Sequence, residues 1–345
     1  MEGLNVAVLF YEERLPDRTE HDEVVDQIAA ALWAVGHRPT LVGVQNDLAE
    51  LVSRLRELKP DLVFNVCETF GGRDTNEGNV TAVLVLLNLP YTGTGPVGMA
   101  LRQDKAVTKK LLQFHEVRCP RFAIFDVGEL ELTGRMRFPL IVKPMRGDAS
   151  AGVDDSSVVR DYGSLTERVA VIHRDFADAA LVEEFIEGRE FYVGVLGNEP
   201  PEALPIVEMD FTKLPPGFPH VYGWRAKFDH SSEQYDSVNA IIATDLAPEV
   251  RHRLSTAALE AVFALQVRDY ARVDMRLAGD GTPYVIEVNA NPYLEQTSAF
   301  AFAALQAGMG YNTLIKRLVD IAWKCSQERG AAKDLACRLP ARPTA

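Results

Sequence analysis

The first third of the chain alternates apolar, strand-like runs with segments of helical periodicity, and this alternation restricts the fold more than any other feature. The apolar runs cover residues 4–10, 40–44 and 61–66, and the helix-like segments cover 21–35, 48–58 and 80–87. Strands that alternate with helices in this way pair in parallel, because each helix returns the chain to the same edge of the sheet. The sequence therefore predicts an open parallel α/β domain that binds ligands at the carboxyl ends of its strands.

Beyond residue 100 the pattern changes to a smaller α+β unit and then to a larger one. A lysine-rich helix is expected over residues 103–114, and later strands are expected at 122–126 and 140–143. The last unit has long strands, a Pro/Gly-rich loop and a helix at 247–265. We expect domains at residues 1–102, 103–188 and 189–327, and a loosely held tail at 328–345.

Two strand-like runs near the end of the chain bring acidic and amide side chains together. Arg272 and Asp274 in YARVDMRL share one face of a strand, as do Glu287 and Asn289 in VIEVNANP, because side chains two apart point the same way. An Asp-Gly pair between the runs is a strong hairpin-turn signal. The hairpin would place Asp274 beside Glu287 and Asn289. Oxygen ligands of this kind suit Mg²⁺.

Composition excludes several classes of partner. With 36 Lys+Arg and 49 Asp+Glu, the net charge of −13 argues against nucleic acid and against an acidic membrane surface. The sequence contains no run of 18 or more apolar residues, so we expect no membrane span. The first residues do not resemble a signal peptide. The scattered cysteines have no metal-binding spacing, so we expect reduced thiols and a cytoplasmic location.

The order of short motifs K…IVKP…AG…VEEFIEGREF…AKF…ARVD…EVNANP resembles the ATP-grasp superfamily, in its D-alanine:D-alanine ligase-like branch, over residues 6–322. The resemblance implies a three-domain α/β architecture with an open parallel N-terminal domain, a small α+β central domain and a larger α+β C-terminal domain. It also implies an ATP-dependent carboxylate-amine ligase, which converts a carboxylate to an acyl phosphate before an amine attacks and releases ADP and phosphate.

The same resemblance implies the ligands. ATP would bind between the second and third domains with two Mg²⁺ ions, for which Mn²⁺ is a substitute. The substrates would be a small-molecule carboxylate and amine, and by analogy the chain would form a homodimer.

Individual positions match the family's nucleotide contacts. The phosphate-binding lysines correspond to Lys105, Lys143 and Lys227. Glu183 would accept from the adenine amino group, and Glu190 would accept from the ribose hydroxyls. The hinge backbone corresponds to Glu184, Phe185 and Ile186. Without the resemblance, the acidic segment would be an ordinary solvated turn, and Lys109 and Lys110 on the lysine-rich helix are expected to be solvated.

The match extends to the chemistry. Asp274, Glu287 and Asn289 correspond to the metal ligands, and Arg272 corresponds to the arginine that stabilises the oxyanion of the tetrahedral intermediate. In the phosphate-covering loop, the ligases' consecutive serines are replaced by Ala149 and Ser150. Ser150 is therefore a candidate catalytic residue, with loop capping as the alternative.

Substrate choice is where the sequence departs from the ligases. Tyr293 replaces a glycine and Glu295 is an added acid that could attract a cationic acceptor, while Ser298 aligns with the serine that holds the acceptor carboxylate. The alternative is that Tyr293 packs and Ser298 caps the next helix. Three further candidate substrate residues are Glu20, Asn65 and Glu68, although an acid such as Glu20 is also favourable at a helix start.

The function expected from these residues is amide or peptide bond formation between amino acid or peptide substrates other than two D-alanines. Two alternatives stay open: a natural-product tailoring enzyme that uses another nucleophile, and a non-catalytic nucleotide-binding protein. The intact set of ligands beside Arg272 argues against the second, because binding alone needs no oxyanion stabiliser.

Overall fold

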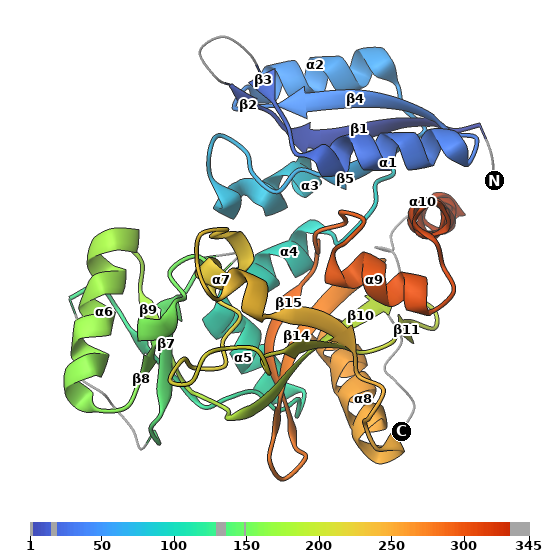
Figure 1. The fold of residues 1–345 in the computed structure, drawn as a ribbon. Helices are drawn as coiled ribbons and strands as arrows, with labels where there is room; N and C mark the ends of the chain where they lie inside the picture. Colours follow the sequence, from blue (N-terminus) through green and yellow to red (C-terminus); the bar gives the residue numbers. More distant parts are fainter. Residues whose placement is uncertain (1–2, 15–18, 129–135, 148–149, 332–345) are drawn as a thin grey trace.

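The computed structural model describes residues 3–14, 19–128, 136–147 and 150–331 of the chain. Figure 1 shows the N-terminal, central and C-terminal sheets, each with its own helices. The helices are α1 Glu23–Ala34, α2 Leu48–Leu58, α3 Glu77–Leu86, α4 Pro96–Gln103, α5 Lys105–Phe114, α6 Tyr162–Phe176, α7 Trp224–Phe228, α8 Pro248–Ala264, α9 Ala299–Gln306 and α10 Tyr311–Ala331.

The N-terminal sheet is parallel and has the strand order β4-β1-β5. Its strands are β1 Asn5–Tyr11, β4 Arg38–Val44 and β5 Leu62–Val66. The predicted open α/β arrangement is confirmed, since the buried apolar runs became the strands and α1 and α2 lie between them. A short antiparallel ribbon that the sequence did not reveal, β2 Glu13–Arg14 and β3 Thr19–Glu20, precedes α1.

The joint after this domain is helical, which the sequence did not predict. Its turn-rich residues lead into α4, which has a proline in its first turn, where a missing N–H costs nothing. Asp104 then ends α4 and caps α5 by accepting from Ala106 N at 3.0 Å and Val107 N at 2.9 Å. The lysine-rich helix expected over residues 103–114 is present as α5, and α4 is an additional helix that ends just before it at Asp104.

The second and third sheets form the two walls of a cleft. The central sheet has the order β6-β9-β7-β8, and α6 packs on it (Figure 1). Its strands are β6 Phe122–Phe125, β7 Leu140–Pro144, β8 Val158–Val159 and β9 Ala180–Glu184. The C-terminal sheet has the order β13-β12-β10-β14-β15, with β11 paired to β10. Its strands are β10 Gly188–Leu196, β11 Glu202–Ala203, β12 Val207–Asp210, β13 Asn239–Ile242, β14 Tyr270–Ala278 and β15 Pro283–Asn289.

The predicted hairpin is present as β14 and β15. In its register Asp274 lies opposite Glu287 and Arg272 lies opposite Asn289, with an irregularity between Asp274 and Met275. The turn between the strands contains Gly281, whose φ of 77° suits glycine. The hairpin therefore brings together the side chains that the sequence predicted on one face of each strand, which are those of Arg272, Asp274, Glu287 and Asn289.

Buried hydrogen bonds join the N-terminal domain to the end of this hairpin. Tyr270 Oη donates to Asn291 Oδ1 at 2.7 Å, and Asn291 Nδ2 donates to Glu77 Oε1 at 3.0 Å. The other oxygen of Glu77 forms an ion pair with Arg102. We call this chain of side chains the Glu77–Asn291–Tyr270 relay. It connects α3 to the segment that follows β15.

Two further observations concern the expected cellular setting. Cys67 and Cys119 are free thiols, but Cys325 is disulfide-bonded, so the expectation of reduced cysteines is wrong for Cys325. Among the described residues no helix has the length and hydropathy needed to cross a membrane. The predicted tail at 328–345 lies almost entirely outside the described residues.

Candidate active site

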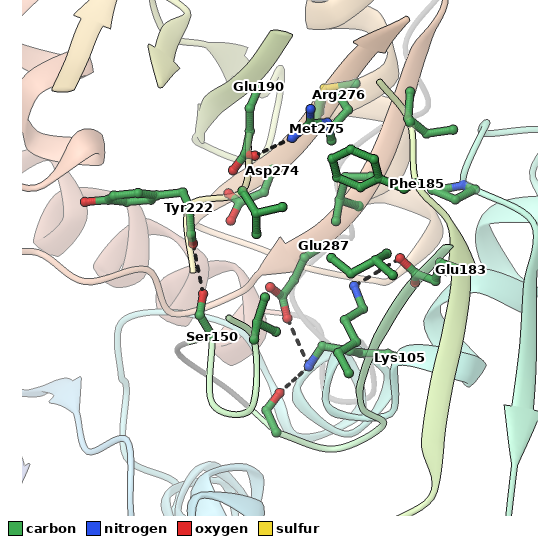
Figure 2. A pocket seen from close by; sticks show the side chains of 18 of the residues that line it. Lys105, Ser150, Glu183, Phe185, Glu190, Tyr222, Asp274, Met275, Arg276 and Glu287 are labelled. Atoms are coloured by element: carbon green, nitrogen blue, oxygen red, sulfur yellow. Dashed lines mark hydrogen bonds and ion pairs between the residues drawn. The ribbon is translucent and has the colours of Figure 1, made fainter. Parts of the chain in front are cut away.

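A pocket opens between the central and C-terminal sheets. The space between its walls is about 820 Å³, counting the open mouth. Figure 2 shows side chains from both walls pointing into it. Of the sequence-predicted residues, the lining includes Lys105, Lys143, Ser150, Glu183, Glu184, Phe185, Ile186, Glu190, Lys227, Asp274 and Glu287.

The hairpin brings the predicted metal ligands and Arg272 together at one end of this pocket. Arg272 donates to both oxygens of Asp274, from Nε at 2.7 Å and from Nη2 at 2.9 Å, and its guanidinium lies 4.6 Å from the ring centre of Tyr192. Asn289 Nδ2 donates to Asp274 Oδ2 at 3.2 Å. Burial lowers the pKa of Arg272, but the carboxylate of Asp274 outweighs it and raises the pKa. Arg272 therefore stays charged.

Lys105 reaches the same end of the pocket from α5. Its Nζ lies 3.2 Å from Glu287 Oε1 and also donates to the carbonyl of Gly147. Figure 2 shows Lys105 and Glu287 pointing toward each other. The predicted phosphate-binding lysine and a predicted metal ligand thus lie within contact of one another.

Lys143 and Glu183 lie on paired strands of the central sheet, and a third charged residue joins them. Glu183 Oε2 lies 3.1 Å from Lys143 Nζ, and Glu183 Oε1 lies 2.6 Å from Lys109 Nζ. The expectation that Lys109 is solvated is wrong, because its side chain is only 1% exposed. Lys110, one residue further along α5, is exposed as expected.

The hinge segment crosses the mouth of the pocket between β9 and β10. The side chain of Glu184 accepts from Arg137 N at 3.0 Å, and Glu184 is one of the residues that line the pocket. The ring of Phe185 lies 4.8 Å below the guanidinium of Arg276. The Phe185 N–H is bonded to the carbonyl of Pro139 at 2.9 Å.

Arg276 is a site residue that the sequence reasoning missed. Its Nη1 donates to Glu190 Oε2 at 2.9 Å, and its Nη2 donates to the carbonyl of Gly188 at 2.9 Å. Burial raises the pKa of Glu190, and the positive charge of Arg276 opposes this rise. The sequence contained a signal for this position, because Arg276 follows Arg272 and Asp274 at a spacing of two and so lies on the same face of the strand.

Ser150 belongs to the predicted phosphate-covering loop, and its partner is Lys227. Lys227 Nζ donates to Ser150 Oγ at 2.7 Å, while Ser150 Oγ donates to the carbonyl of Tyr222 at 3.4 Å. Burial lowers the pKa of Lys227, and Arg272 lowers it further. Ala149, which takes the place of the ligases' first serine, lies outside the described residues.

A second, more open pocket lies against the N-terminal domain and contains three of the predicted substrate residues. These are Glu20, Glu68 and Tyr293. Its described lining also includes Glu13, His21 and Asp22 but no lysine or arginine. Tyr293 Oη donates to Asp22 Oδ1 at 2.7 Å across this pocket. Asn65 is not part of the described lining, because it is a buried residue of β5 whose side chain accepts from Cys67 N at 3.3 Å.

The segment after Tyr293 is held to α1. Gln27 Nε2 lies 3.4 Å from Glu295 Oε1, and Gln27 Oε1 accepts from Gln296 N at 3.0 Å. Ser298 caps α9 by accepting from Ala301 N at 3.3 Å, as the second interpretation of the sequence expected. Its predicted contact with an acceptor carboxylate stays a prediction.

The donor set fits Mg²⁺ bound together with a phosphate ligand. Among the described residues, no three His, Cys, Asp or Glu side chains lie close enough to form a complete metal site. Asp274 and Glu287 supply two carboxylates, and the amide of Asn289 supplies a third oxygen beside them. Mg²⁺ keeps several water or phosphate oxygens in its shell, so an incomplete protein cage of this kind suits it.

Comparisons with known proteins agree with this arrangement. Residues 125–320 match the family model described as D-ala D-ala ligase C-terminus. A D-alanine–D-alanine ligase of Pelotomaculum thermopropionicum is 30% identical over 283 residues, covering 79% of this chain and 83% of that protein. An uncharacterized protein, y4sG, of Sinorhizobium fredii is 35% identical over 314 residues, covering 89% of both chains.

A solved structure has the same fold. The crystal structure of the D-alanine–D-alanine ligase from Bacillus anthracis complexed with ATP superimposes with a TM-score of 0.73, at 22% identity, over 95% of this chain and 100% of that one.

Proposed function

Starting from the premise that this chain belongs to the D-alanine–D-alanine ligase family, we propose that it is an ATP-dependent carboxylate-amine ligase acting on substrates other than two D-alanines. The hairpin of β14 and β15 carries this proposal, because it brings Arg272, Asp274 and Glu287 together at one end of the pocket between the central and C-terminal sheets. Simple binding of a nucleotide does not require a charged arginine beside two carboxylates.

The lysines on three sides of the pocket account for binding of the ATP phosphates. Lys105 comes from α5, Lys143 from β7 and Lys227 from α7, and all three line the cavity. Converging ammonium groups stabilise a polyanion in a partly desolvated site more strongly than in water. The relative from Bacillus anthracis was solved with ATP, which supports ATP as the nucleotide.

The adenosine end would lie at the hinge. Glu190, held by Arg276, is placed to accept from the ribose hydroxyls, and the backbone of Glu184 and Ile186 lines the pocket beside it. The ring of Phe185 provides an apolar surface there, because Arg276 stacks on it.

Mg²⁺, or Mn²⁺ in its place, would be held by Asp274, Glu287 and Asn289, two ions in all, and would neutralise charge on the phosphates during transfer. The carboxylate substrate attacks the γ-phosphorus, the bond to the bridging oxygen breaks, and ADP leaves. The amine then attacks the acyl phosphate, and Arg272 stabilises the negative oxygen that forms. Collapse of this tetrahedral intermediate releases phosphate and leaves an amide.

The acidic pocket supports a substrate that carries a positive charge. Glu13 and Glu20 lie opposite each other in the β2–β3 ribbon, and Asp22 and Glu68 complete the acidic lining. A carboxylate placed among these groups would be repelled, whereas an ammonium would be stabilised. Tyr293, where the ligases have glycine, reduces the space for a small acceptor. We therefore favour an amino acid or peptide whose amine enters this pocket.

The test is to measure release of ADP and phosphate from Mg-ATP with a panel of D- and L-amino acids, dipeptides and polyamines. We expect release only with a matched acid and amine, and a product whose mass is their sum minus water. A product formed with another kind of nucleophile would identify the natural-product tailoring enzyme instead. Tight ATP binding without release for any pair would favour the non-catalytic binding protein.

Two subsidiary proposals follow from the same family assignment. The chain would act in the cytoplasm, where ATP is available, and would form a homodimer by analogy with the ligases. Cell fractionation tests the first. Light scattering on the purified protein tests the second, and a monomer at micromolar concentration would contradict it.

A further inference from the structure

Three charged residues in the wall of the nucleotide pocket form a buried triad. Lys109 is on α5, Lys143 is on β7 and Glu183 is on β9. Their side chains are 1%, 7% and 1% exposed, respectively. Lys143 and Glu183 line the pocket, but Lys109 lies behind them and does not.

Each lysine contacts a different oxygen of Glu183. Lys109 Nζ lies 2.6 Å from Oε1, and Lys143 Nζ lies 3.1 Å from Oε2. The carboxylate is thus shared between two ammonium groups, and the triad has a net charge of +1. Because Lys109 contacts Glu183 Oε1, Lys143 cannot pair with both oxygens of Glu183. The positive charge of Lys143 is therefore only partly neutralised on the side that faces the pocket.

We propose that Lys109 is a positioning residue that, through Glu183, holds the ammonium of Lys143 in place and keeps its charge available to the phosphates of ATP. This inference rests on the proposed use of ATP. It concerns a residue that touches neither the nucleotide nor the metal ligands, so its effect must pass through its neighbour.

A purely structural role explains the triad less well. Burying three charged groups carries a large desolvation cost, and apolar residues of similar volume often stabilise a protein as well or better. Glu183 could also hold Lys143 by itself as a neutral pair. The additional buried lysine is accounted for if the pocket requires a surplus of positive charge.

The test compares binding of Mg-ATP with binding of adenosine by calorimetry. For Lys109→Met we expect affinity for Mg-ATP to fall about tenfold, which is about 1.4 kcal/mol, while affinity for adenosine stays within twofold. The matched control is Lys110→Met, one residue away and exposed, which should leave both affinities unchanged. Lys109→Arg keeps the charge and should restore Mg-ATP binding.

A double-mutant cycle identifies the route of the effect. If Lys109 acts through Lys143, then Lys109→Met should add nothing to the loss of Mg-ATP affinity already caused by Lys143→Met. Additive losses would overturn the inference, as would equal losses for ATP and adenosine in Lys109→Met, which indicate a general structural defect. Unchanged Mg-ATP affinity in this variant would overturn it too.

Folding is checked first by circular dichroism. If Lys109→Met does not fold, Lys109→Gln, which keeps an N–H donor but no charge, takes its place in every comparison with the same expected results. A wild-type protein that binds adenosine but not Mg-ATP would refute the proposed function and this inference together. A wild-type protein that binds Mg-ATP, with no phosphate-specific loss in the variants, refutes this inference alone.

Discussion

Substitution of Arg272 by lysine separates catalysis from binding. Arg272 donates from two nitrogens to the two oxygens of Asp274, at 2.7 and 2.9 Å, and its side chain is 17% exposed. A lysine would keep the positive charge but cannot reproduce the planar pair of donors. Arg272 is also absent from the residues that line the nucleotide pocket. Its replacement should therefore affect the chemical step and leave nucleotide binding intact.

The size of the effect follows from the role of the donor. Loss of one well-placed donor to a developing oxyanion typically lowers kcat by about 10²–10³, or about 2.7–4 kcal/mol in the barrier. We expect Arg272→Lys to lose turnover by this factor while the dissociation constant for Mg-ATP changes less than about threefold. Folding should be preserved, because Asp274 keeps a cationic neighbour and its bond from Asn289.

The assay is steady-state phosphate release with the acid and amine pair identified by product mass, together with calorimetric binding of Mg-ATP. The control is Arg189→Lys, which disrupts a similar two-nitrogen contact with Glu208, at 2.7 and 2.5 Å, outside the nucleotide pocket. Turnover of Arg272→Lys within threefold of wild type would refute the assigned role. A loss of Mg-ATP affinity equal to the loss of turnover would show that Arg272 acts in binding.

Three further predictions concern other parts of the site. Tyr293→Gly removes the ring from the acidic pocket and the 2.7 Å bond to Asp22, so phosphate release with D-alanine as acceptor should rise above the wild-type rate; an unchanged rate would contradict the assigned role in specificity. Burial lowers the pKa of Lys143 from 10.5, with Glu183 and Glu287 opposing the shift and Lys109 and Lys105 reinforcing it. Because only the charged form attracts phosphate, affinity for Mg-ATP should fall as pH rises through a midpoint below 10.5. Lys143→Arg should reduce that fall, and Lys227, whose pKa burial also lowers, should account for what is left of it. Ser298→Ala removes the cap of α9 and should lower the free energy of unfolding by about 1 kcal/mol in urea titrations, with little change for Ser53→Ala on the surface of α2.

The strands, most helices and the hairpin could be predicted from the sequence because their signals are local. Alternation on β14 and β15 and an Asp-Gly turn were sufficient to place Asp274 beside Glu287. The burial of Lys109 could not be predicted in this way. Its partner Glu183 comes from a strand more than seventy residues away, and a lysine four positions after another on an amphipathic helix looks like a solvated residue.

The lack of a local sequence signal also explains the other differences between the predicted and the observed structure. Nothing local in the segment before Asp104 indicated that it forms the helix α4, because its glycines and proline are typical of turns. For Arg276, the position on the strand face could be predicted from the sequence. Its contact with Glu190 could not, because it depends on how β10 pairs with β14. Contacts across a sheet or between domains require the fold before they can be assigned.

The Glu77–Asn291–Tyr270 relay has a consequence for motion. Asn291 lies two residues beyond the predicted metal ligand Asn289, and its amide is bonded on one side to the N-terminal domain and on the other to β14. A rotation of the N-terminal domain that carried α3 away would have to break a buried bond to a carboxylate or pull this segment with it. A movement of the N-terminal domain, which carries most of the acidic pocket, would therefore be transmitted to the segment that follows the predicted metal ligands.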